Sequence, residues 1–229
     1  MPPRQRQSTG LLLTVVLVLT LLGLAPAPLQ AASPDPLEQR LAQWPAWSLP
    51  APLPRPGNHD LHYPTWFEGT WRVSSHDLSG QQADISYTVR FQRNDQGAVV
   101  GDRAFNASAI GRALLGDGLL SVQNDPLNPN RQLALLAGDQ QLESTVVGRR
   151  TSATSGDTFL ADELALQVLH GPGDPRVSRV ETLSRYRQLD PSHIAAEQWQ
   201  GSYGSPAEGL QARSRRSWQG SLSLERLPN

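Results

Sequence analysis

Apolar and polar residues alternate along much of the chain after Tyr63, and a period of two is typical of β-strands with one buried face. In ISYTVRF, residues 85–91, every second side chain is apolar, and SWQGSLSLERL, residues 217–227, alternates in the same way. Similar runs lie between them, separated by turn signals: AVVGDRAF, GLLSVQ, QLALLA, LESTVVGRR, LADELALQVL, VSRVETLSRYRQL and EQWQGSY. The pattern predicts about nine or ten short strands, at the spacing typical of an antiparallel sandwich or barrel.

The first residues carry a pattern of a different kind. Arg4 and Arg6 precede an uncharged apolar run, residues 10–24, and small and turn-forming residues follow it. This order is that of a secretory signal peptide, and the run is shorter than the roughly 20 residues that a membrane-spanning helix needs. We therefore predict a signal peptide over residues 1–31, cleaved near Ala31, and an exported mature protein. An uncleaved membrane anchor is the alternative.

Prolines crowd the next segment, residues 32–63, and predict an extended arm or linker. One island within it, DPLEQRLAQW, has the signals of a short helix, with Asp35 as N-cap, Pro36 at the first helical position and an acid at the capping-box position. The apolar stripe of this helix consists of Leu37, Leu41 and Trp44. We expect the stripe to pack on the chain's own domain, residues 64–229, with a partner protein as the alternative.

Composition narrows the possible functions. The chain has 229 residues with 20 basic and 21 acidic side chains. It therefore lacks the excess of positive charge that favours nucleic acid as a partner. It contains no cysteine and no lysine, and its only methionine is Met1. These absences exclude thiol nucleophiles, thiolate zinc sites, iron–sulfur clusters and lysine Schiff bases. Without disulfides, an exported chain must depend on a large core for its stability.

The segment YPTWFEGTW, residues 63–71, places large aromatic residues and one glycine at the start of the predicted sheet. A closed antiparallel barrel must fill its ends, and an indole on the opening strand is one way to do so. Gly69 allows a close approach of the backbone, and Trp71 would then lie at one end of the barrel. An arginine late in the chain can place its guanidinium over that ring, and Arg185 and Arg187 are the candidates.

With this Gly-x-Trp segment and a late arginine, the chain resembles the lipocalin-like superfamily. LHYPTWFEGTW, VETLSRYR, EQWQGSY and the terminal Trp strand are also similar to a family of uncharacterised lumenal proteins of cyanobacteria and plastids. This resemblance extends from Trp47 to the C-terminus and implies a thylakoid-lumen or periplasmic location, with no established activity. We predict an all-β fold, a single antiparallel lipocalin-like β-barrel of about 8–10 strands behind a Pro-rich N-terminal arm with one short helix.

Aromatic residues are the candidates for the barrel interior. They are Trp71, Tyr87, Phe91, Phe105, Trp199 and Tyr203. A barrel of about eight to ten strands has an interior wide enough for side chains or for one small ligand. Core packing and ligand lining therefore compete for the same residues, and packing is favoured.

Catalytic and metal-binding patterns are weak. His59, Asp60 and His62 could be drawn as zinc ligands, but histidines in a proline-rich loop are usually solvated. GSYG, residues 201–204, lacks the central serine of a nucleophile elbow. Four glutamates could supply a carboxylate pair, although the sequence brings no two of them together: Glu68, Glu163, Glu181 and Glu197. We therefore expect no metal, no cofactor and no enzymatic activity.

Two functions remain from the sequence. The first is an exported protein that binds a small hydrophobic ligand, such as a lipid, pigment or isoprenoid, without catalysis. The second is a lumenal interaction or assembly protein that docks on a membrane protein complex through its arm and loops. In either case we expect a monomer.

Overall fold

The structure is a computed structural model, and it describes residues 35–50, 52–152 and 156–228. The predicted signal peptide, residues 1–31, and the first residues of the predicted arm lie outside this range. The described chain begins at the N-cap of the predicted short helix.

One antiparallel sheet of eleven strands dominates the described chain, and it confirms the predicted all-β class. The spatial order is β1-β4-β3-β2-β11-β10-β9-β8-β7-β6-β5. The strand count exceeds the predicted 8–10 by one because the two-residue β1 forms from the end of the arm. The strands are β1 (His62–Tyr63), β2 (Gly69–Asp77), β3 (Ile85–Arg93), β4 (Val99–Gly101), β5 (Leu119–Asp125), β6 (Asn128–Leu136), β7 (Gln140–Thr151), β8 (Thr158–His170), β9 (Arg176–Asp190), β10 (His193–Tyr203) and β11 (Arg216–Arg226).

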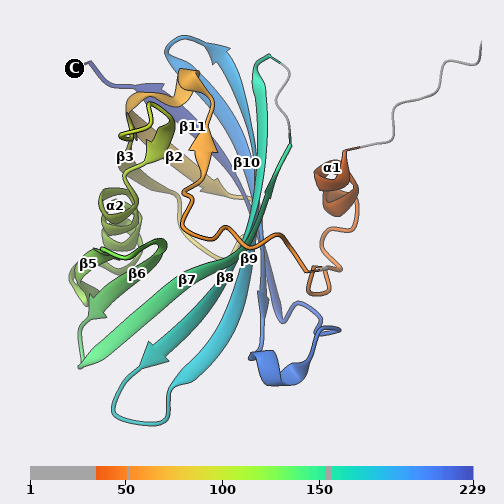
Figure 1. The fold of residues 1–229 in the computed structure, drawn as a ribbon. Helices are drawn as coiled ribbons and strands as arrows, with labels where there is room; N and C mark the ends of the chain where they lie inside the picture. Colours follow the sequence, from red (N-terminus) through yellow and green to blue (C-terminus); the bar gives the residue numbers. More distant parts are fainter. Residues whose placement is uncertain (1–34, 51, 153–155, 229) are drawn as a thin grey trace, which may run out of the picture. The chain divides into compact units, whose positions relative to one another are not determined.

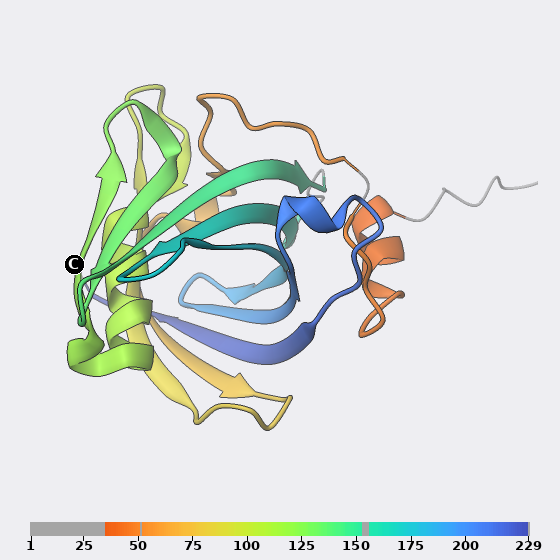
Figure 2. The same cartoon turned by 90° about the horizontal axis from the view of Figure 1, so that it is seen from below.

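The sheet curls into a half-barrel, and β1 and β5 form its two edges (Figures 1 and 2). Strand pairing does not close the barrel within the described residues, contrary to the expected closed form. A helix, α2 (Arg103–Leu115), lies between β3 and β5 on the concave side and contacts both strands. The curl is therefore completed by a helix.

The strand predicted over AVVGDRAF, residues 98–105, is confirmed in its first half as β4, whereas helix α2 replaces its second half and corrects the prediction of only one short helix. The strand β4 ends at Gly101, and the Asp102 side chain then accepts a hydrogen bond from the Phe105 N–H (3.3 Å), which caps the helix. Asn106 holds the helix against β3, because its side chain accepts from the Arg90 N–H (2.7 Å) and donates to the Arg90 carbonyl (3.1 Å). The helix thus packs beside the part of β3 that the short β4 does not pair with.

The predicted short helix is confirmed as α1 (Pro36–Leu41), with Asp35 accepting from the Leu37 N–H (2.7 Å). The first part of the arm, residues 35–50, lies on the outer, convex face of the sheet (Figure 1), whereas Leu61 near its end joins the concave side. Trp47 is 1 % exposed, and the Leu49 N–H donates to the Ala212 carbonyl (2.7 Å). The buried residues of this outer cluster are Leu37, Trp47, Leu160, Leu183 and Trp199.

A second hydrophobic cluster fills part of the concave side. Its aromatic centre comes from the short helix η1 (Thr65–Phe67) and from β2, β3 and β8. Phe67 and Trp71 are both fully buried, and the Trp71 indole donates to the Phe67 carbonyl (2.7 Å). The other buried members are Leu61, Val73, Val89, Phe91, Val99, Phe159, Ala161, Ile194, Ala196 and Leu224.

Candidate ligand-binding site

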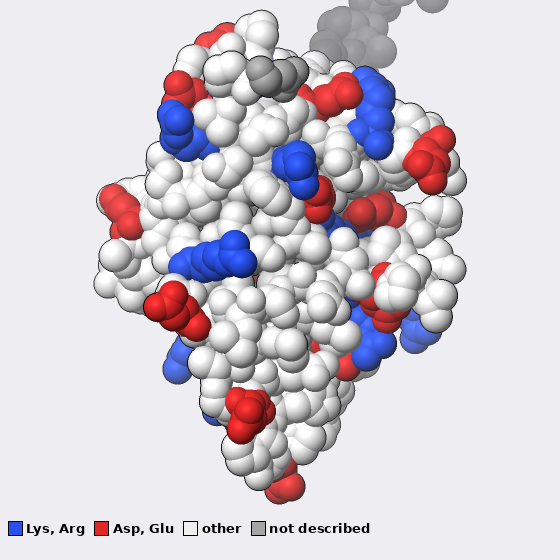
Figure 3. Space-filling view, turned by 90° about the vertical axis from the view of Figure 1, so that its left-hand side faces the viewer, with Lys and Arg blue, Asp and Glu red and all other residues white. Residues whose placement is uncertain are grey.

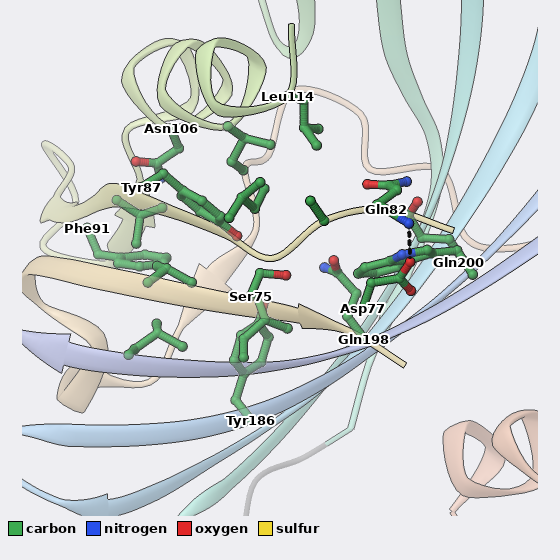
Figure 4. A pocket seen from close by; sticks show the side chains of 18 of the residues that line it. Ser75, Asp77, Gln82, Tyr87, Phe91, Asn106, Leu114, Tyr186, Gln198 and Gln200 are labelled. Atoms are coloured by element: carbon green, nitrogen blue, oxygen red, sulfur yellow. Dashed lines mark hydrogen bonds between the residues drawn. The ribbon is translucent and has the colours of Figure 1, made fainter. Parts of the chain in front are cut away.

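Beside the concave cluster, between the sheet and α2, lies a cavity of about 320 Å³ that is partly open to solvent (Figure 4). Its volume is at the lower end of the range of small-molecule sites. The period of two along each strand places alternate side chains in it, and α2 contributes residues one helical turn apart. The lining comprises Tyr63, Val73, Ser75, Asp77, Gln82, Ala83, Ile85, Tyr87, Val89, Phe91, Asn106, Ile110, Leu114, Tyr186, Gln198, Gln200, Trp218, Leu222 and Leu224.

The two ends of the cavity differ in chemistry. Tyr87 and Phe91 lie toward one end in Figure 4, below the first turns of α2. Asp77, Gln82, Gln198 and Gln200 gather toward the other end. The cavity is therefore amphipathic, with an aromatic end and an amide-rich end.

Asp77 organises the polar end. Its carboxylate accepts hydrogen bonds from the Ser79 N–H (2.8 Å) and from the N–H groups of Gln81 and Gln82, which fixes the turn after β2. Burial acts to raise the pKa of Asp77. The backbone donors, with a smaller contribution from the Trp218 indole, act in the opposite direction and outweigh burial, so the pKa of Asp77 lies below its usual value. Asp77 is thus a carboxylate at neutral pH.

The tyrosines around the cavity are neutral. Burial raises the pKa of Tyr87 and Tyr186 above the usual value, and it raises the pKa of Tyr63 well above it. The only other ionisable lining residue among those described is Asp77, and no Arg or His lines the cavity. The site therefore carries one negative charge, placed at its polar end.

The Gly-x-Trp segment lies at one end of the concave cluster. The arginine that covers the Trp71 ring is neither Arg185 nor Arg187. Arg226 lies directly across from Trp71 in the β11–β2 register, with its guanidinium 4.3 Å from the ring centroid. It also donates to the carbonyls of Trp66 (3.0 Å), Pro191 (2.9 Å) and Glu68. Gly69 has a φ of 128°, and a Cβ there would lie 2.6 Å from Arg226 Nη1.

Arg185 and Arg187 lie elsewhere. Arg185 is on the outer face, 5.6 Å from the Trp199 ring centroid, and it pairs with Glu197 (3.3 Å) and with Glu38 of α1. Arg187 is exposed. The error arose because an arginine's place depends on strand register, which a single sequence does not reveal.

Of the six aromatic candidates, the structure brings only Tyr87 and Phe91 into the cavity. Trp71 is buried in the adjoining cluster. Phe105 lies on α2, 37 % exposed, with the Arg90 guanidinium 4.5 Å from its ring centroid. Trp199 and Tyr203 are buried on the opposite face of the sheet, beneath the arm. The polar lining residues were missed because glutamines on a strand resemble an exposed face.

The outer face holds a buried ionic cluster. Arg40 of α1 makes two hydrogen bonds to Glu181, Nε to Oε1 (2.8 Å) and Nη2 to Oε2 (2.6 Å), and Tyr203 donates to the same carboxylate (2.6 Å). Asp162, also fully buried, accepts from Arg150 (2.9 Å) through one oxygen, while its other oxygen has no partner. Burial and the nearby Glu181 raise the pKa of Asp162 to about 7.

The candidate metal and carboxylate sets do not assemble. His59 and His62 are exposed, and within the described residues no three His, Cys, Asp or Glu side chains are placed to hold a metal ion. Each of the four candidate glutamates instead faces an arginine. The pairs are Glu68 with Arg93, Glu163 with Arg103 and Arg149, Glu181 with Arg40, and Glu197 with Arg185.

The outside of α2 and of the β5–β6 hairpin is poor in charge. Figure 3 shows this side, where scattered charges of both signs interrupt a largely uncharged surface. Its exposed apolar side chains are Phe105, Leu114, Leu115, Leu120, Leu127 and Leu135. Among the helices in the described part of the chain, none has the length and apolar character needed to cross a membrane.

Residues 76–217, more than half of the chain, match the family described as Domain of unknown function (DUF6816). The chain belongs to this family. The match begins in β2 and ends in β11, so it includes most of the curled sheet, α2 and the polar end of the cavity. No curated protein and no solved structure matches the chain.

Proposed function

We propose that the protein binds a small hydrophobic or amphipathic molecule in the cavity between α2 and the concave face, without covalent chemistry. The observation that carries this proposal is a cavity of about 320 Å³ between α2 and the buried concave cluster. An aromatic wall offers a dry surface to an apolar group, and burial of that surface would drive binding. The lipocalin-like resemblance agrees with such a role.

The size of the cavity favours a compact ligand. At about 30 Å³ for each water-sized unit, 320 Å³ accommodates roughly ten non-hydrogen atoms. A short-chain lipid or a small isoprenoid fits this volume better than a large pigment. A longer tail would have to extend beyond the cavity, where the lining residues Gln82, Ala83 and Leu114 are exposed.

The alternative, docking on a membrane complex through the arm, has less support. Leu37, Trp47 and Leu49 are the apolar groups that such a contact would use, and all three are buried on the sheet. The arm is thus already engaged by its own domain.

Export is part of the proposal. The basic and apolar pattern of residues 1–31 supports a cleaved signal peptide, followed by a periplasmic or thylakoid-lumen location. N-terminal sequencing of the mature protein from an exporting host should find a start near residue 32. An intact N-terminus in the cytoplasmic fraction would contradict it.

The binding proposal is tested with the uncharged dye N-phenyl-1-naphthylamine. We expect saturable fluorescence enhancement with the native protein and its loss in Ile110→Trp, because the indole would occupy the cavity from α2. Arg112→Trp, on the exposed side of the same helix, is the matched control and should bind as the native protein does. Equal binding by Ile110→Trp, or no saturable binding by the folded native protein, would overturn the proposal.

A further inference from the structure

We propose that the ligand carries an uncharged, hydrogen-bonding head group that lies between Gln198, Gln200 and Ser75, and that the site rejects carboxylates. This inference rests on the proposed function and names the ligand class of the same cavity. Its ligands would be alcohols, aldehydes, ketones or amides with an apolar body of the size given above.

The charge of the cavity gives the first reason. A fatty-acid carboxylate that loses its water on entering the cavity needs a cation or several donors directed at it. The described lining offers no Arg or His and contains the Asp77 carboxylate. Arg103, which is near enough to influence the lining residue Tyr63, is already held by Asp60 (2.7 Å) and Glu163 (3.2 Å). An anion would therefore enter against Asp77 with no counter-charge.

The hydrogen-bonding capacity gives the second reason. Gln198 donates to Ser184 (3.0 Å), so its amide is oriented, and its carbonyl oxygen remains an acceptor. The half-buried Gln200 side chain lines the same end of the cavity and offers both an amide donor and a carbonyl acceptor. A bound ligand would displace water from these amides, so its head group must offer hydrogen bonds in exchange. A hydroxyl or carbonyl meets these groups without bringing a charge.

Asp77 is a poor counter-ion for a cationic head group. Its two oxygens already accept three backbone N–H groups of the turn that follows β2. The same bonds keep it ionised, so that it repels an anion while its own lone pairs are largely engaged. This arrangement favours uncharged ligands over both charged classes.

The test uses three eight-carbon ligands that differ only in the head group: 1-octanol, octanoate and n-octylamine. Each displaces the naphthylamine dye at about pH 7, where the acid and the amine are ionised. We expect octanol to bind at least about tenfold more tightly than octanoate, and more tightly than octylamine. Equal or tighter binding of either charged ligand would overturn the head-group assignment.

A charge-reversing variant makes the test independent of a simple loss of folding. Gln200→Arg places a cation at the polar end without touching the turn that Asp77 stabilises, and it should raise octanoate affinity relative to octanol by at least about tenfold. Gln200→Leu is the matched variant. It should weaken octanol binding relative to dye binding, which is measured directly with the same variant. If Gln200→Arg gains no preference for octanoate, the head group does not lie at Gln200, and the inference fails.

The two proposals fail in different ways. If the dye and all three octyl ligands fail to bind, the cavity is not a ligand site and the proposed function is wrong. If the dye binds but octanoate competes as well as octanol does, the cavity binds ligands and only the head-group class is wrong.

Discussion

Each face of the sheet is covered by an element outside the sheet, but the two covers act differently. The arm with α1 inserts Leu37 and Trp47 into the outer face and neutralises Glu181 there with Arg40. On the concave face, none of the described residues of α2 is fully buried, and a cavity lies beneath the helix. The comparison indicates that the outer cover serves stability, whereas the inner cover forms one wall of a cavity.

The largest expected effect is on the outer face. Arg40→Leu leaves the fully buried Glu181 without its cation, and loss of one partner from a buried pair typically costs about 3–5 kcal/mol. Urea unfolding should show this loss. Dye binding by the folded fraction should be unchanged, because the cavity is on the other face.

A rescue variant separates charge from packing. Arg40→Leu combined with Glu181→Leu and Tyr203→Phe replaces the network by apolar groups and should recover most of the lost stability. A triple variant as unstable as Arg40→Leu alone would mean that the arm depends on the shape of Arg40, and not on charge.

The next effect concerns the filled end of the concave side. Gly69→Ala puts a Cβ against the Arg226 guanidinium at a positive φ, so we expect a loss of about 1–3 kcal/mol. Gly57→Ala is a control for a positive φ without a Cβ contact, since Gly57 has a less strained φ of 58° and open space around its Cβ position. The thermal midpoint of Gly69→Ala should fall further. Equal falls in the thermal midpoints of the two variants would show that the contact with the Arg226 guanidinium contributes nothing to the loss of stability.

The last effect, similar in size to that of Gly69→Ala, is the pH dependence of the outer cluster. Asp162 keeps its proton up to about pH 7 when folded, but an unfolded aspartate releases it near pH 4. Between these values the unfolded state binds fewer protons, so this group's contribution lowers stability as the pH rises. Asp162→Asn should therefore gain about 1–3 kcal/mol at about pH 8 and much less at about pH 5. A stability difference independent of pH, measured by urea unfolding, would rule this out.

The sequence predicted the features that depend on neighbouring residues. Alternation in 85–91 and 217–227 gave β3 and β11, and the capping signals at Asp35 gave α1. Helix α2 was missed because it has no apolar stripe that would indicate a helix with a buried face.

The site depends on pairing between distant segments. The arginine over Trp71 is set by the β2–β11 register, which joins residues far apart in the chain. Gln198 and Gln200 reach the cavity only because β10 lies beside β11 in the curled sheet. Local sequence patterns contain no information on these pairings, so the aromatic candidates alone were found, and two of them line the cavity.

The central claim, that the space beneath α2 is a binding site, is tested most directly by isothermal titration calorimetry of 1-octanol into the native protein and into Ile110→Trp. The account predicts one saturable site per chain with a negative heat-capacity change, and no such site in the variant. The same heat from both proteins, or no saturable heat from the native one, would contradict it.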